Sequence, residues 1–269
     1  MIKREFTILR CAALGVNAVE SNTRHIFPRH THEQYGIGVI KNGAQKSSSG
    51  RGMVEAGPGD TITVNPGEVH DGAPIGDAGR SWHMLHFDPP IVAGAMHDMT
   101  EGKTRDYEFR QPVIDDVRIA TCFAQLFSTF TTVGEPDVLR REELLFALLR
   151  KVMAEENCFL VKEPIPKAIC IAKSIIDDRP ATPITLADPA RASSLNRFRL
   201  LRGFVKATGL TPHAYLMHRR IERARRLIAR GTGLAEAAVA SGFADQSHMT
   251  RIFVRNYGIP PGAYARAMN

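Results

Sequence analysis

Hydrogen-bond donors and cations are spaced along one face of the segment 246–255. If Met249, Ile252 and Phe253 face a hydrophobic core at helical spacing, the polar side chains face away from it. That outward set is Gln246, Ser247, Thr250, Arg251 and Arg255. Such side chains at the start of a helix can donate hydrogen bonds to base edges in the major groove of DNA. The pattern therefore indicates a recognition helix.

The sequence around this face is typical of a helix, a tight turn and a second helix. Apolar residues fall at helical spacing in 234–241 and again in 246–253, on either side of a break at 242–245. Gly242 supplies the backbone conformation that such a turn requires, and the carboxylate of Asp245 is placed to cap the second helix. From the pattern alone, an ordinary helical hairpin with a solvated polar face is the alternative.

These residues resemble the DNA-binding domain of the AraC/XylS family of bacterial transcription regulators. The resemblance is carried by GFADQS at 242–247, RIF at 251–253 and GIPP at 258–261, which stand in the family's order and spacing. It extends over 167–268. The resemblance implies two helix-turn-helix units joined by one long helix, with double-stranded DNA and RNA polymerase as partners.

The first of these units is expected to begin in 185–190 and to place its second helix at 196–208, closed by Gly209. Matching this helix to the family motif implies that four side chains contact DNA, where arginine can bind guanine or phosphate. They are Asn196, Arg197, Arg199 and Arg202. The unit departs from the family pattern at Pro189, inside its first helix, and at 192–193, a turn that often contains glycine.

The helix that joins the two units should begin at Thr211 and Pro212, with threonine as cap and proline in the first turn. Its length of about 19 residues corresponds to about 28 Å, close to the roughly 34 Å between successive major-groove faces of B-DNA. One chain could therefore place both recognition helices on one side of the duplex. Four arginines of this helix are expected to be mostly solvated: Arg219, Arg223, Arg226 and Arg230.

Charge is distributed unevenly along the 269 residues. Residues 162–269 contain 18 Lys and Arg against 7 Asp and Glu, a net charge of +11, whereas residues 1–161 contain 17 against 21, a net charge of −4. A basic half joined to a mildly acidic half is typical of a nucleic-acid-binding domain attached to a domain that does not bind nucleic acid. We expect no signal peptide and no membrane span, and the four cysteines lack CxxC spacing, so a cytoplasmic protein is favoured.

The N-terminal half has the pattern of a β domain. Over 6–87, short β runs alternate with turns that contain glycine or proline. Several short strands at close intervals predict a sandwich or barrel. On the last strand, at 81–87, alternation places Trp82, Met84 and His86 on one face.

This half also resembles the sensor barrels with two cupin motifs that precede AraC-type DNA-binding domains. The resemblance is carried, in order, by PRHTH at 28–32, Gly43, GPGD at 57–60 and PGEVH at 66–70. In metal-binding cupins, a histidine pair, a following glutamate and a histidine of the second motif hold the ion. His30, His32 and His70 stand at the matching places, and strand parity lets His30 and His32 both face inward.

Three interpretations of these histidines stay open. The motif glutamate is missing, because the matching positions hold Gly36 and Ile37. Three histidines with an open position could still bind zinc or iron, the histidines could be satisfied structurally, or they could line a pocket for an organic effector. We favour the effector, although Trp82 could equally belong to the core. The expected effector-binding residues are His30, His32, Tyr35, His70, Trp82 and His86, with no metal, no cofactor and no catalytic residue.

The β pattern stops at Pro89 and Pro90. Polar, irregular residues at 97–112 are expected to form a loop, and apolar stripes then predict amphipathic helices around 119–130 and 145–153. Prolines in the next segment indicate a linker. The domain prediction is 1–110 for a cupin-like effector-binding barrel, 111–157 for a helical pair that packs on it or forms a homodimer, 158–166 for the linker and 167–269 for the AraC-type DNA-binding domain.

Together these observations predict a multidomain β + α protein, with an N-terminal cupin-like β-barrel, a helical pair and a C-terminal all-α domain of two helix-turn-helix units. The resemblance implies a sequence-specific DNA-binding transcription regulator whose small-molecule effector shifts the population competent to bind DNA. Activation is the commoner outcome in the family. Two rivals are a metal-dependent cupin sensor or enzyme fused to a DNA-binding domain, which the missing glutamate disfavours, and a DNA-binding module with an inactive barrel.

Overall fold

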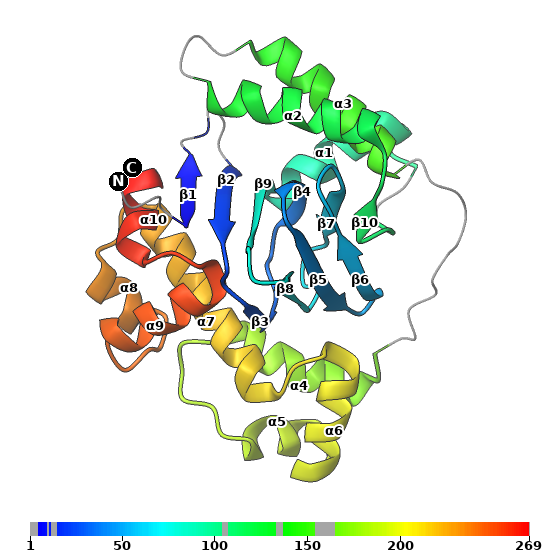
Figure 1. Cartoon of the computed structure of the whole chain (residues 1–269). Coiled ribbons are helices and arrows are strands. Elements are labelled where there is room, and N and C mark those ends of the chain that lie inside the picture. Colours follow the sequence, from blue (N-terminus) through cyan, green and yellow to red (C-terminus); the bar gives the residue numbers. More distant parts are fainter. Residues whose placement is uncertain are drawn as a thin grey trace. The chain divides into compact units, whose positions relative to one another are not determined.

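The structure is a computed structural model that describes residues 5–9, 11, 15–103, 107–132, 137–153 and 165–268. The chain divides into two compact units, Met1–Asn157 and Cys158–Asn269 (Figure 1). The first unit holds the strands and three helices, and the second unit is helical. Among the described helices, none is both long enough and apolar enough to cross a membrane.

Two antiparallel sheets form the β part of the N-terminal unit. One has six strands in the order β1-β2-β9-β4-β7-β10, and the other has four in the order β3-β8-β5-β6. The strands are β1 (Phe6–Leu9), β2 (Val16–Thr23), β3 (Phe27–His30), β4 (Tyr35–Asn42), β5 (Ala44–Ser49), β6 (Gly52–Ala56), β7 (Thr61–Val64), β8 (His70–Ile75), β9 (Arg80–Phe87) and β10 (Val113–Ile114). The predicted alternation of short strands and turns is confirmed, and the strands form two sheets.

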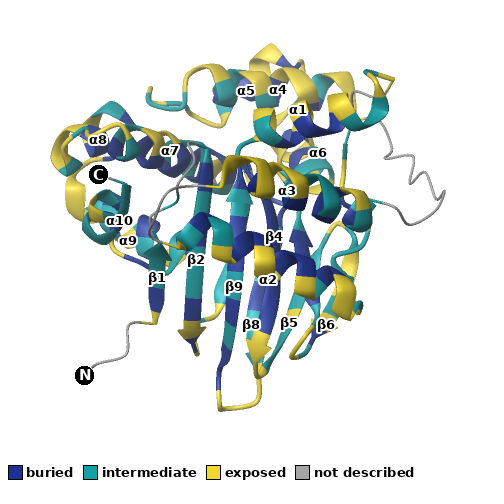
Figure 2. Cartoon of the chain, turned by 90° about the horizontal axis from the view of Figure 1, so that it is seen from above, coloured by how far each residue is buried: buried dark blue, intermediate teal, exposed yellow. Residues whose placement is uncertain are grey.

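One face of the six-stranded sheet packs against helices α1 (Pro89–Thr100), α2 (Val117–Thr131) and α3 (Val138–Met153). On this side of β9, Leu85 and Phe87 are fully buried, and the ring of Phe87 lies 6.3 Å from that of Phe130 on α2. Figure 2 shows α2 and α3 lying over the strands. This apolar layer is the main hydrophobic core of the unit, and its burial holds the predicted helical pair against the sheet.

The opposite face of the six-stranded sheet is turned toward the four-stranded sheet, and we call it the inner face. Its residues on β9 are Arg80, Trp82, Met84 and His86, by strand alternation. Arg80 donates hydrogen bonds to the side chain of Gln45 on β5 and to the carbonyl oxygen of Gly72 on β8. The two sheets therefore lie face to face, and the three side chains predicted to share one face of the last strand do so.

The expectation of a loop over 97–112 is wrong only at its start. Helix α1 extends to Thr100, the described residues 101–103 and 107–112 belong to no helix or strand, and β10 follows directly. Pro89 and Pro90 occupy the first two positions of α1, where a helix has no intrahelical partner for a backbone N–H, so these prolines begin a helix as well as end a strand. The predicted linker 158–166 lies outside the described residues except for Ile165 and Pro166.

Seven helices are described in the C-terminal unit. They are α4 (Lys167–Asp178), α5 (Ala187–Ala192), α6 (Arg197–Thr208), α7 (Pro212–Ala229), α8 (Leu234–Ala240), α9 (Gln246–Tyr257) and α10 (Pro261–Met268). The pairs α5–α6 and α8–α9 are the two expected helix-turn-helix units, and α7 joins them. Thr211 caps α7, whose 18 residues span about 27 Å at about 1.5 Å per residue.

Four arginines of the joining helix were expected to be mostly solvated. Three of them are exposed, namely Arg223, Arg226 and Arg230. Arg219 instead forms an ion pair with Asp177 on α4, at 2.9 Å, and the exposed Arg223 donates to the carbonyl oxygen of Ala240 on α8, at 3.0 Å. A sequence periodicity cannot reveal these partners, because both lie on other helices.

Candidate DNA-binding surface and effector site

Helix α9 presents the polar face predicted for the second recognition helix. Asp245 caps the helix by accepting a hydrogen bond from the backbone N–H of His248, at 2.6 Å. Met249 and Phe253 are fully buried, and all of the polar face is exposed except half-buried Thr250. That face consists of Gln246, Ser247, Thr250, Arg251 and Arg255. The predicted cap and the predicted outward direction of these side chains are confirmed.

The turns of the two units use different residues to reverse the chain. Gly242 has a φ of 87°, and a Cβ there would lie 2.6 Å from the carbonyl oxygen of Ala181, so both backbone strain and contact exclude a side chain. In the first unit, Ser194 adopts the left-handed conformation, with a φ of 55°. Pro189 is the third residue of the six-residue α5, where its missing N–H leaves no intrahelical bond unmade.

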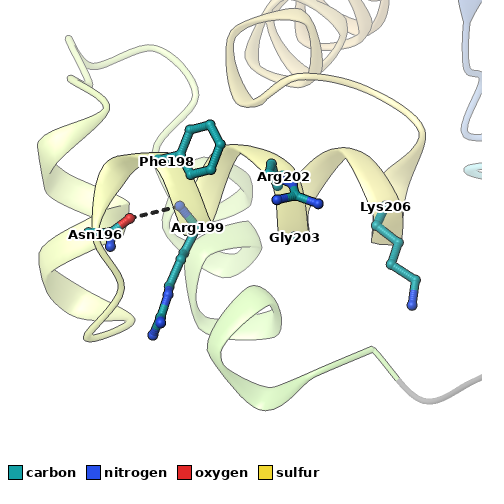
Figure 3. A pocket seen from close by; sticks show the side chains of 6 residues that line it. All are labelled: Asn196, Phe198, Arg199, Arg202, Gly203 and Lys206. Atoms are coloured by element: carbon teal, nitrogen blue, oxygen red, sulfur yellow. Dashed lines mark hydrogen bonds between the residues drawn. The ribbon is translucent and has the colours of Figure 1, made fainter.

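Helix α6 exposes a cationic face that includes an aromatic ring (Figure 3). Leu200 and Phe204 anchor the helix and are fully buried. The exposed side lines an open pocket formed by Asn196, Phe198, Arg199, Arg202, Gly203 and Lys206. Arg197, the first residue of the helix, is also exposed. All four predicted residues of this unit are therefore exposed, on the N-cap and the first half of one helix.

Phe198 is a candidate DNA contact that was not among the four residues predicted for this unit. Its side chain is 66% exposed, and the guanidinium carbon of Arg202 lies 5.6 Å from its ring centroid. An apolar side chain beside cationic donors can contact the methyl group of thymine. The signal that could have identified it is an aromatic residue within an otherwise polar helix face.

A buried polar network fixes α9 against α7. The Glu222 carboxylate is 5% exposed and accepts hydrogen bonds from Arg225, at 2.6 and 3.0 Å, and from the hydroxyl of Tyr257 on α9, at 2.9 Å. Arg225 also donates to the hydroxyl of Tyr264 on α10, at 3.1 Å. Burial raises the pKa of Glu222, but the charge of Arg225 and these hydrogen bonds outweigh it and hold the pKa below its ordinary value. The second recognition helix is thus positioned by an ionised pair.

Three histidines meet on the inner face of the N-terminal unit. His30 ends β3, His70 begins β8, and His32 lies two residues beyond β3. Their candidate ligand nitrogens all lie within 4.8 Å of one another. The ring centroid of His86 on β9 lies 5.7 Å from that of His32. The prediction that His30 and His32 face inward is confirmed, and His86, also predicted for this site, approaches His32 from the opposite sheet.

Backbone carbonyls orient two of these rings. Nδ1 of His30 donates to the carbonyl oxygen of Pro28, at 2.7 Å, and Nδ1 of His70 donates to that of Glu68, at 3.0 Å. Because a carbonyl oxygen can only accept, Nδ1 carries a proton in both rings, and in the neutral form of each ring Nε2 carries the lone pair. Burial lowers the pKa of His70, which favours the neutral ring. The arrangement suits a metal ion or a hydrogen-bond donor of a ligand.

A second group on the inner face is aromatic. Trp82 is buried, its ring lies 6.2 Å from that of Phe27, and the Arg80 guanidinium lies 4.8 Å from its centroid. Burial lowers the pKa of Arg80 to about 10. Both groups contact Phe27, whose ring lies 5.7 Å from that of His30, so this face is chemically mixed, as small-molecule sites are.

Tyr35 does not belong to the inner face, although we expected it to bind the effector. It pairs with Phe87 across the strands and lies on the side of the sheet that packs against the helices. Its hydroxyl donates to the carbonyl oxygen of Tyr107, at 2.7 Å. The strand parity of Tyr35 relative to Gly36 explains the difference, since adjacent residues point to opposite faces.

Both units match known protein families. Residues 17–149 match the AraC-like ligand binding domain, and residues 190–267 match a helix-turn-helix domain. The chain belongs to the AraC family of transcriptional regulators. An uncharacterized HTH-type transcriptional regulator of Bacillus subtilis, YbfI, is 29% identical over 229 residues, which cover 83% of this chain and 81% of that protein.

Other relatives of this AraC-family regulator match over shorter stretches. The transcriptional activator NphR of Rhodococcus sp is 36% identical over 84 residues, which cover 31% of this chain and 25% of NphR. Among solved structures, apo ToxT from Vibrio cholerae has a TM-score of 0.60 at 14% identity and covers 99% of both chains. At that identity the likeness concerns the fold. ToxT with a bound unsaturated fatty acid has a TM-score of 0.55 at 14% identity, covering 98% of this chain and 97% of that one.

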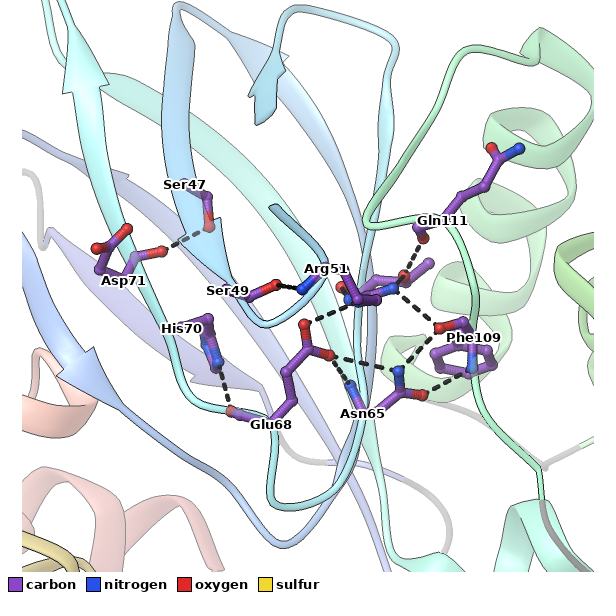
Figure 4. A network of polar contacts seen from close by, with 10 residues as sticks. Ser47, Ser49, Arg51, Asn65, Glu68, His70, Asp71, Phe109 and Gln111 are labelled. Atoms are coloured by element: carbon purple, nitrogen blue, oxygen red, sulfur yellow. Dashed lines mark hydrogen bonds and ion pairs between the residues drawn. The ribbon is translucent and has the colours of Figure 1, made fainter. Parts of the chain in front are cut away.

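In this AraC-family chain, a polar network connects the histidines with the segment that precedes α2 (Figure 4). The backbone carbonyl oxygen of Glu68 accepts the hydrogen bond from His70, and the Glu68 carboxylate accepts one from Nε of Arg51, at 2.8 Å. Arg51 donates to the carbonyl oxygen of Phe109, at 3.0 Å, and Asn65 exchanges two hydrogen bonds with the Phe109 backbone. Burial raises the pKa of Glu68, but its bonds to Arg51 and Ser49 lower it overall, so the carboxylate stays ionised.

Asn196 has a structural role besides the DNA contact expected of it. Its side-chain oxygen accepts a hydrogen bond from the backbone N–H of Arg199, at 2.8 Å, and so caps α6 (Figure 3). We expect Asn196→Ala to lower the free energy of unfolding by about 1 kcal/mol, measured by urea denaturation. Asn196→Ser, which keeps a capping oxygen, should retain most of that stability. Equal losses in the two variants would contradict the capping role.

Proposed function

We propose that this regulator binds its operator through α6 and α9 together and that a small molecule bound on the inner face controls this binding. The proposal is carried by one observation: each helix is capped at its start and exposes cations and amide or hydroxyl groups opposite a fully buried apolar pair. The proposed DNA contacts are Asn196, Arg197, Phe198, Arg199, Arg202, Gln246, Ser247, Thr250 and Arg251. Arginine at these positions would bind guanine or phosphate.

The effector site proposed is the inner face, with His30, His32, His70, Trp82 and His86 as contact residues. Supporting it, this surface lies within the part of the chain that matches the AraC-like ligand binding domain. ToxT, which shares the fold, has been solved with a fatty acid bound, so a small organic ligand is a reasonable expectation for this chain too. We propose that Glu68, Arg51 and Phe109 carry the effect of the ligand toward α2.

Further parts of the proposal concern partners and outcome. We infer activation through contact with RNA polymerase, action in the cytoplasm, no enzymatic activity, and a homodimer formed through the helical pair. Support for activation comes from NphR, whose name describes an activator. Exposed Val138 and Leu139 at the start of α3 would favour dimer contacts, since isolated apolar side chains gain by burial. The domain limits we propose are those predicted from the sequence.

Arg251→Ala tests the DNA-binding proposal. Operator sequences are first selected from random DNA with the full chain, and affinity is then measured by fluorescence anisotropy at fixed salt. We expect the substitution to weaken binding by about 1–3 kcal/mol, because it removes one bidentate or phosphate contact. Arg266→Ala, which removes an exposed charge on α10, should leave affinity nearly unchanged. Equal operator affinities of Arg251→Ala and the unmodified chain would contradict the proposal that Arg251 on α9 contacts DNA.

A further inference from the structure

The strand pairing sets His86 beside the one motif position that could have held a carboxylate on the inner face. Gly36 on β4 is directly opposite His86 on β9. A Cβ added to Gly36 would lie 3.7 Å from Cδ2 of His86 and 3.5 Å from the sulfur of Met84, so a side chain there would point to the inner face. Ile37, the other candidate position, pairs with Leu85 and is fully buried on the helix side.

A Cβ at position 36 would be in ordinary van der Waals contact with the His86 ring, so positions 36 and 86 reach the same part of the inner face. The ring of His86 lies 5.7 Å from that of His32, which compares with 5.3 Å between His32 and His70. His86 thus lies next to His32, at the edge of the three histidines whose ligand nitrogens lie within 4.8 Å of one another.

We propose that His30, His32, His70 and His86 together hold one divalent transition-metal ion, with the imidazole of His86 in the place of the missing carboxylate. This metal site rests on the proposed function, because the ion would bind on the inner face proposed there as the effector site. It goes beyond the organic effector that the sequence favours, and it places the ion on the same inner face as Trp82 and Arg80, on the other side of the Phe27 ring.

The chemistry of the donors fits such an ion. Imidazole nitrogen is a suitable ligand for Zn²⁺, Ni²⁺, Co²⁺ and Cu²⁺, and zinc–nitrogen bonds are about 2.0–2.1 Å long. The hydrogen bonds from Nδ1 of His30 and His70 to backbone carbonyls are the outer-shell contacts that metal-binding histidines make, and they direct Nε2 toward the ion. Small rotations of the rings would bring nitrogens that lie within 4.8 Å of one another to a common centre.

Calorimetric titration of the metal-free full chain with Zn²⁺ tests the site. We expect one ion per chain, and we expect His30→Ala and His86→Ala each to weaken Zn²⁺ binding by at least about 10-fold. His213→Ala, which removes an exposed histidine on α7, is the matched control and should bind as the unmodified chain does. Absence of stoichiometric binding, or full affinity in His30→Ala, would overturn the site.

Two measurements isolate the part played by His86. X-ray absorption of the zinc-loaded unmodified chain should count four imidazole nitrogens, and this measurement does not depend on a variant folding. Gly36→Glu combined with His86→Ala should recover most of the lost affinity, since a carboxylate would then reach the ion from the position that His86 has vacated. A count of three imidazoles, or His86→Ala with unaltered affinity, would overturn the four-histidine site.

Failure of the metal site and failure of the proposed function are separable. DNA binding by the metal-free chain depends on α6 and α9, and it is measured on the selected operator without Zn²⁺. A chain that binds its operator but no Zn²⁺ would overturn the metal site alone. A chain that binds Zn²⁺ through the four histidines, but whose operator affinity does not change with Zn²⁺, would support the metal site and contradict its role in control.

Discussion

Glu222→Ala is expected to lower the free energy of unfolding of the C-terminal unit by about 3–5 kcal/mol. The substitution would leave the guanidinium of Arg225 buried without its carboxylate partner and would remove the acceptor of the Tyr257 hydroxyl. A buried charge that loses its partner costs far more than an exposed one, because the low-dielectric surroundings give it no compensating hydration. Since Tyr257 ends α9, the second recognition helix should loosen with the network.

Urea denaturation of the full chain, followed by far-ultraviolet circular dichroism, measures this effect. Glu236→Ala is the matched control, because Glu236 is an exposed glutamate on α8 and its loss removes the same charge. We expect that control to change stability by no more than about 0.5 kcal/mol. A loss below about 1 kcal/mol in Glu222→Ala would mean that the network is not what holds α9 to α7.

Local sequence signals predicted the C-terminal unit well because its elements are defined by neighbouring residues. Asp245 bonds to a backbone N–H three residues away, and Gly209 ends α6 with a φ of 75°, so both helix ends follow from short segments. The buried pair Met249 and Phe253 follows from helical spacing. Helix ends and buried positions of this kind depend on a few neighbouring residues, so they can be predicted from one sequence.

What the sequence could not predict depends on pairing between distant strands or helices. His86 was expected at the effector site, but its place beside His32 depends on two sheets that face each other, and Tyr35 points away because its partner is Phe87. A period of two assigns residues to a face but does not say which face is inside. The ion pair of Arg219 with Asp177 is missed for the same reason, since the two residues are 42 positions apart in the sequence.

The double variant Arg202→Ala/Arg251→Ala should have the largest effect on operator binding. Each arginine contact is worth about 1–3 kcal/mol. The two residues lie in separate helix-turn-helix units, so we expect the losses to add, to about 2–6 kcal/mol, or between about 30-fold and about 20,000-fold in affinity. Fluorescence anisotropy at fixed salt measures the affinities, with Arg230→Ala/Arg266→Ala as a control that removes two exposed charges elsewhere.

Lysine at the same positions separates the two kinds of contact. Lysine keeps the charge that binds phosphate but loses the planar, bidentate donor pair that reads guanine. A base contact should therefore be lost in Arg251→Lys, whereas a phosphate contact should largely survive and Arg251→Ala should reduce the salt dependence by about one ion. The same comparison applies at Arg202.

Whether the affinity losses of Arg202→Ala and Arg251→Ala add decides whether both helix-turn-helix units contact the operator. If Arg202→Ala alone has no effect while Arg251→Ala does, only the second unit contacts bases, and the double variant would fall no further than Arg251→Ala. The strained turn at Ser194 and the six-residue α5 would then be the structural cause, because they set the angle at which α6 leaves its unit. If both single losses appear and sum, the about 27 Å length of α7 is sufficient to place α6 and α9 in successive major grooves.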